Sequence, residues 1–163
     1  MNELSTSVDI DAPSDVVWDV LTDFDEYGEW NPFALVAGRP TEGARLTVEL
    51  RPPGKRATTF RPTVTRVDPG EELRWRGHLF VRGLYDGEHR FSLEALDDGR
   101  TRFVQSETFE GLLVGPINRW LGDATREGFE AMNEALRARA ESRAGTSAGD
   151  AAAAAGAAGD AAV

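Results

Sequence analysis

Residues 117–142 read INRWLGDATREGFEAMNEALRARAES, and this stretch decides the fold. Apolar side chains recur in it at helical spacing, which predicts one long amphipathic helix that begins after Pro116 and ends near Ser142. Its apolar stripe consists of Ile117, Trp120, Leu121, Ala124, Gly128, Phe129, Met132, Ala135 and Leu136. A helix with such a stripe must bury it against another apolar surface, and the preceding sequence predicts a β-sheet that can supply one.

The sequence before this helix is rich in predicted strands. Residues 4–10 alternate apolar and polar side chains, the pattern of a half-buried strand, and two short helices follow near 13–22 and 25–28. Further strands are predicted at 45–51, 58–67, 72–81, 85–96 and 100–110. Turn residues such as Asp97-Asp98-Gly99 separate them, and short turns join antiparallel strands. The chain is therefore predicted to be an α+β domain with a curved antiparallel sheet wrapped around the C-terminal helix.

The composition sets the domain boundaries. Residues 1–143 have the apolar and charged content of one folded domain, whereas 144–163 consist mainly of alanine and glycine. Such a tail has too little apolar surface to offset the entropy lost on ordering, so it is predicted to be disordered.

Charge and cysteine content narrow the classes of function. The chain of 163 residues has a formal net charge of −10, which opposes binding to nucleic acid, and it has no cysteine for a disulfide or a thiolate nucleophile. No apolar run is long enough to span a bilayer, and the start of the chain does not resemble a signal peptide. We expect an acidic cytoplasmic protein, and the sequence leaves its oligomeric state open.

Four short motifs carry a resemblance to a known superfamily. They are Ile10-Asp11-Ala12-Pro13 with Val17-Trp18, Trp30-Asn31-Pro32-Phe33, Gly87-Glu88-His89-Arg90-Phe91, and residues 107–113. On these motifs residues 3–143 resemble the START-like, or SRPBCC, superfamily, and within it the polyketide cyclase/dehydrase and lipid transport group. The resemblance implies a helix-grip fold with a hydrophobic cavity between sheet and helix. It does not imply one ligand or one reaction.

Strand alternation selects the candidate polar residues. His89, Gln105 and Glu107 share the parity of the apolar face, whereas His78 has the opposite parity and is predicted to face solvent. A short turn at 97–99 would place His89 opposite Glu107 or one pair away. A carboxylate beside an imidazole suits general acid/base chemistry. The alternative is that these groups only satisfy one another or hold water in a cavity.

The predicted ligand-binding set combines aromatic walls with these polar groups: Trp30, Phe33, Trp75, His89, Phe91, Gln105, Glu107, Phe109, Leu112, Leu113 and Trp120. Leu112 and Leu113 lie in a loop between two glycines, which is either a lid over the cavity or part of the core. A dry cavity of about 300 Å3 would cost about 7 kcal/mol of stability. The cavity is therefore wetted, normally filled, or smaller than the resemblance implies.

These observations leave three functions open. The first is binding of a small hydrophobic or aromatic molecule, lipid-like or polyketide-like, with no cofactor. The second is a cyclase or dehydratase that uses His89 and Glu107 as acid and base, again without a cofactor. The third is a partner-binding domain like the activators of the Hsp90 chaperone. A metal site at Asp86, Glu88 and His89 is disfavoured because adjacent strand residues point to opposite faces.

Overall fold

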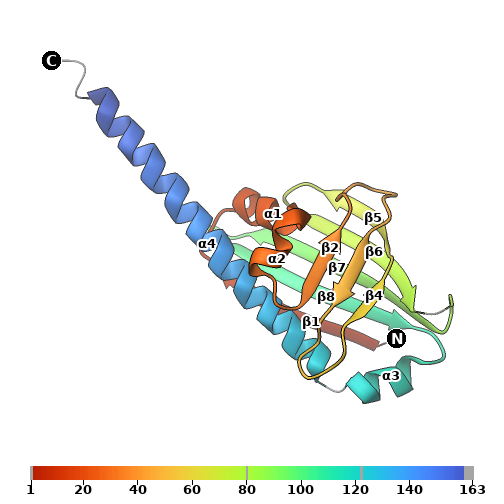
Figure 1. Ribbon diagram of the computed structural model, residues 1–163. Helices are drawn as coiled ribbons and strands as arrows, with labels where there is room; N and C mark the ends of the chain where they lie inside the picture. Colours follow the sequence, from red (N-terminus) through yellow and green to blue (C-terminus); the bar gives the residue numbers. More distant parts are fainter. Residues whose placement is uncertain (1, 80, 122, 160–163) are drawn as a thin grey trace.

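The computed structural model describes residues 2–79, 81–121 and 123–159 (Figure 1). The helices are α1 (Ser14–Thr22), the 3-10 helix η1 (Phe24–Glu26), α2 (Tyr27–Trp30), α3 (Val114–Leu121) and α4 (Ala124–Gly159). The strands are β1 (Asn2–Ile10), β2 (Ala34–Ala37), β3 (Thr47–Leu50), β4 (Thr58–Phe60), β5 (Thr63–Asp68), β6 (Glu72–Leu79), β7 (Tyr85–Ala95) and β8 (Thr101–Glu110). The α+β class and the two short helices after the first strand are confirmed.

The larger sheet has five antiparallel strands in the order β1-β8-β7-β6-β5. Its central hairpin, β7–β8, turns at the predicted Asp97-Asp98-Gly99 sequence, and the register places His89 directly opposite Glu107. Gly77 of β6 lies opposite Gly87 of β7 in the same sheet. The predicted boundaries of β6, β7 and β8 are confirmed to within a few residues. The alternation of buried and more exposed side chains along β7 and β8 confirms which face of the sheet they were predicted to share.

A second, three-stranded sheet in the order β2-β3-β4 lies across the first (Figure 1). The prediction of one strand over 58–67 is wrong, because β4 ends at Phe60 and β5 begins at Thr63. Pro62 lies in the break, and proline has no N–H group to continue a ladder. The sequence analysis did not predict β2 either. An isolated β-bridge pairs Arg45, which precedes β3, with Thr63 of β5 in the larger sheet.

The C-terminal helical region is divided into two helices. The prediction of one helix from 117 is wrong, since α3 ends at Leu121 and α4 begins at Ala124. The intervening sequence, Gly-Asp, is a poor helix former. In the structure α4 continues to Gly159 and projects beyond the sheets (Figure 1), and residues 160–163 of the predicted disordered tail lie outside the described residues. Alanine has the highest helix propensity, which accounts for this continuation. In the described ranges, no helix is long and apolar enough to cross a membrane.

The core forms where α4 crosses β1 and α1. Phe129, Met132 and Leu136 of α4 are buried, as the predicted stripe requires. Among the described glycines, Gly128 leaves the least room for a side chain. A Cβ built on it would lie 2.2 Å from the Phe33 ring. Phe33 also packs edge-to-face on Phe129, with ring centroids 5.6 Å apart. Position 128 therefore has to be glycine for α4 to pack this closely.

We predict opposite effects for two glycine-to-alanine substitutions in α4. Gly128→Ala should lower the free energy of unfolding by about 1–3 kcal/mol, the usual cost of overpacking, because its methyl group would overlap Phe33. Gly145→Ala should raise it by about 0.5–1 kcal/mol through helix propensity, since nothing lies within 4 Å of the added Cβ. Urea denaturation measures both values, and stabilisation by Gly128→Ala would contradict the packing described here.

Candidate functional site

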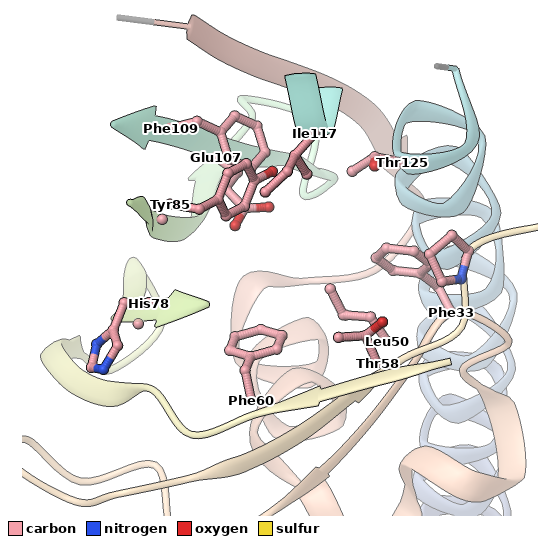
Figure 2. Close-up of a pocket in the computed structure, with 13 residues that line it drawn as sticks. Phe33, Leu50, Thr58, Phe60, His78, Tyr85, Glu107, Phe109, Ile117 and Thr125 are labelled. Carbon is pink, nitrogen blue, oxygen red and sulfur yellow. The ribbon is translucent and has the colours of Figure 1, made fainter. Parts of the chain in front are cut away.

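A cavity of about 110 Å3 lies where the two sheets and the helical region meet (Figure 2). The β3–β4 arm forms one wall and the ends of β6, β7 and β8 form the other. Residues from α3 and the first turn of α4 lie beside them. The described lining residues are Phe33, Leu50, Pro52, Thr58, Phe60, Gly77, His78, Tyr85, Gly87, Glu107, Phe109, Ile117 and Thr125. Most of this surface is apolar, and four of the side chains are phenylalanine or tyrosine.

The cavity is smaller than the resemblance suggested. At about 24 cal/mol per Å3, leaving a dry volume of this size empty costs about 3 kcal/mol. A domain of ordinary stability, about 5–15 kcal/mol, tolerates that cost. A space of this size therefore does not require a permanently bound molecule, unlike the cavity of about 300 Å3 considered from the sequence.

Three of the eleven predicted ligand-binding residues line the cavity: Phe33, Glu107 and Phe109. Four others lie behind it in the core, where they are buried but do not border the open space: Trp75, His89, Phe91 and Gln105. Trp30 packs edge-to-face on Tyr27 at 4.9 Å and does not reach the cavity. The side chain of Trp120 lies outside the described part of the structure.

His89, Gln105 and Glu107 lie together, as the strand parity predicted. Nδ1 of His89 lies 3.5 Å from Oε2 of Glu107, and Nε2 of His89 lies 3.0 Å from Nε2 of Gln105. Which group donates in the Gln105–His89 contact depends on the imidazole tautomer. Of the three, only Glu107 borders the cavity. His89 therefore lies behind Glu107, which separates it from the open space.

Aromatic rings hold the imidazole of His89 in place. It stacks on Trp75 with centroids 5.3 Å apart and 26° between the planes, and it meets Phe129 edge-to-face at 5.1 Å. Phe91 contacts it from its own strand at 4.5 Å. Packing on several sides leaves the ring few alternative orientations, so Nδ1 stays directed toward Glu107.

Two neighbouring residues determine the surroundings of the Glu107 carboxylate. A Cβ built on Gly87 would lie 2.7 Å from Oε1 of Glu107, so the missing side chain provides the space for this oxygen. Burial, together with the negative charge of Glu107, raises the pKa of Tyr85 above its usual value. The Tyr85 hydroxyl remains protonated at neutral pH and donates to Oδ1 of Asn118 at 3.0 Å.

His78 differs in part from its predicted position. It is exposed, as its parity requires, but it also borders the cavity at its edge. Figure 2 shows its ring directed away from the cavity centre. The adjacent Gly77 also lines the cavity.

The loop that contains Leu112 and Leu113 does not cover the cavity. Leu112 is 83% exposed, and neither leucine is among the lining residues. The backbone N–H groups of Leu112 and Leu113 donate to the carbonyls of Gly83 and Leu84, at 3.2 and 2.8 Å. These bonds hold the loop against the connection between β6 and β7. Ile117 of α3 takes the position beside the cavity that the lid hypothesis assigned to the loop.

Sequence reasoning missed ten of the lining residues. Tyr85 and Gly87 share the parity of His89, so alternation could have found them. Leu50, Thr58 and Phe60 carry no such signal, because they reach the cavity only when the β3–β4 arm folds over the larger sheet. The remaining missed residues are Pro52, Gly77, His78, Ile117 and Thr125.

The arrangement supports polar recognition or proton transfer at one point of an otherwise apolar space. Within the described ranges, no group of three or more His, Asp or Glu side chains is placed to hold a metal ion. Glu107 can accept a hydrogen bond or a proton, and His89 can orient it.

The space beside Gly87 provides a direct test of the Glu107 position. Gly87→Ala should displace the carboxylate, because the new Cβ would lie 2.7 Å from Oε1. Stability should change by less than about 1 kcal/mol, since the flexible end of a side chain can move aside. The chain has two histidines, so their imidazole NMR signals can be assigned by substitution. We expect the His89 signal to shift, and an unchanged signal would contradict the described contact.

Comparisons with known proteins agree with this architecture. A structure of a hypothetical protein from Helicobacter pylori superposes with a TM-score of 0.72 at 18% identity, covering 85% of this chain and 88% of the other. The Zhui aromatase/cyclase from Streptomyces sp. R1128 gives 0.70 at 20% identity, covering 87% and 94%. A START superfamily protein from Mycobacterium smegmatis gives 0.65 at 22% identity, covering 86% and 97%. At these identities the structures show a shared fold.

The sequence itself establishes the family. No curated protein sequence matches the chain closely enough to indicate a relative. The family described as polyketide cyclase / dehydrase and lipid transport matches residues 1–144, which include both sheets and the part of α4 that packs on them. With the helix-grip arrangement of its sheets and C-terminal helix, this chain belongs to the START-like polyketide cyclase / dehydrase and lipid transport family.

Proposed function

We propose that this protein binds a small hydrophobic or aromatic molecule in the cavity between the two sheets. The observation that carries the proposal is the composition of the cavity wall. Aromatic and aliphatic side chains surround a space of about 110 Å3, and one carboxylate, that of Glu107, borders it. Ligand sites typically combine an apolar lining with a few polar groups that fix orientation.

The volume and the wall together define the ligand. The space of about 110 Å3 is smaller than the cavity of about 150 Å3 that holds benzene, so it suits at most one small ring or a short aliphatic chain. Phe60, Tyr85 and Phe109 provide aromatic contacts, and Glu107 accepts a hydrogen bond from a donor on the ligand. A longer lipid-like or polyketide-like molecule would occupy the cavity with one end only.

Two adjacent threonines on β4 allow a matched test with benzyl alcohol as the probe. Thr58 borders the cavity and Thr59 does not, and both are exposed on an edge strand. Thr58→Phe should fill the space and weaken binding at least tenfold in isothermal titration, whereas Thr59→Phe should leave it unchanged. Equal effects of the two substitutions, or no binding to the unsubstituted protein, would overturn the proposal.

A second function, a cyclase or dehydratase without a cofactor, is favoured by one specific contact. Glu107 borders the cavity, and Nδ1 of His89 lies 3.5 Å behind its carboxylate. In this reading Glu107 takes a proton from a bound substrate and returns it later in the reaction. His89 is a positioning residue that holds the carboxylate and stabilises its charge.

Turnover of a linear poly-β-ketone thioester, followed by mass spectrometry, tests this second function. Glu107→Gln should lower the rate about 10²–10⁴-fold, the usual contribution of a general acid or base. His89→Gln should lower it less and change the pH profile of the remaining activity, because it acts through Glu107. Glu110→Gln is the control, since Glu110 lies on the same strand and forms an ion pair with Arg76. Unchanged turnover in Glu107→Gln would contradict the enzyme hypothesis.

A further inference from the structure

We infer that the cavity selects ligands that carry a cationic nitrogen on a small apolar or aromatic group. The inference rests on the proposed function, because it requires that the cavity binds a small molecule. It goes further by assigning a charge to that molecule. The charge of the cavity wall and its aromatic surface both support it.

Glu107 brings a carboxylate to the cavity wall, and no lysine or arginine is among the described lining residues. The Glu107 side chain is 13% exposed, and it is the one acidic group among those described residues. The ion-pair partner that the structure gives it is His89, which is positive only when protonated. A carboxylate removed from water is costly unless a positive charge or hydrogen-bond donors compensate it.

The aromatic walls also favour a positive charge on the ligand. The faces of aromatic rings attract cations, and Phe33, Phe60, Tyr85 and Phe109 all border the space. Figure 2 shows Tyr85 and Phe109 beside Glu107, with Phe60 across the cavity from them. Burial keeps the Tyr85 hydroxyl protonated, so this ring adds no second negative charge. An ammonium group next to Glu107 would combine an ion pair with cation–π contacts, whereas a carboxylate ligand would meet a like charge.

Three probes of similar shape isolate the contribution of the ligand's charge. Benzylamine, benzyl alcohol and benzoate each carry one benzene ring, with a cationic, a neutral and an anionic substituent at pH 7. We expect benzylamine to bind roughly ten- to hundredfold more tightly than benzyl alcohol, the range for a hydrogen bond to a charged group. Benzoate should not bind measurably. Isothermal titration at physiological salt measures all three affinities.

Substitutions then locate the source of the preference. Glu107→Gln keeps the shape of the side chain and should reduce the preference for the amine to about twofold or less. Glu110→Gln makes the same change in net charge on the outer face of β8 and should retain the preference. Because the protein as a whole is acidic, Thr58→Phe is a further control. It leaves the net charge unchanged and should still abolish amine binding.

The outcomes distinguish this inference from the proposed function. If benzyl alcohol binds, Thr58→Phe blocks it and benzylamine binds no better, the cavity is a binding site but the inferred charge selection is overturned. If a preference for the amine survives Glu107→Gln, the cation is recognised elsewhere and the inference is also overturned. If neither probe binds, both the inference and the proposed function are overturned.

Discussion

The contact between the Phe33 ring and the backbone of Gly128 determines how closely α4 lies to the sheets. Phe33 is fixed from both sides, because its N–H donates to Oδ1 of Asn31 at 3.0 Å and its carbonyl accepts from the N–H of Arg51 at 2.7 Å. The same ring packs on Phe129 and borders the cavity. One side chain therefore connects the helix, the smaller sheet and the candidate site.

A line of polar groups leads from this core to the cavity. Gln105 contacts His89, His89 faces Glu107, and Glu107 alone reaches the open space. The antiparallel pairing of β7 with β8 sets this order, since it places His89 opposite Glu107.

The small size of the cavity has identifiable causes. Phe60 of the β3–β4 arm approaches β6 so closely that a Cβ on Gly77 would lie 3.3 Å from its ring. The oxygen of Glu107 occupies the space above Gly87, which pairs with Gly77. The arm and the carboxylate thus fill part of the space between the sheets, and the two facing glycines prevent direct overlap. Family membership specifies the helix-grip arrangement, while these local contacts specify what fits inside it.

Local patterns in the sequence determined β1, β6, β7 and β8 of the larger sheet, the first two helices and the shared face of His89, Gln105 and Glu107. Alternation and turn chemistry are properties of neighbouring residues, so they can be recognised without the fold. The sequence by itself did not reveal the division between α3 and α4 or the separate β4 and β5. Only the tertiary structure decided which of the candidate residues border the cavity. The β3–β4 arm brings Thr58 and Phe60 to the same cavity as Glu107 from more than forty positions away in the sequence. Local periodicity cannot predict a contact between residues so far apart in the chain, because it depends only on neighbouring residues.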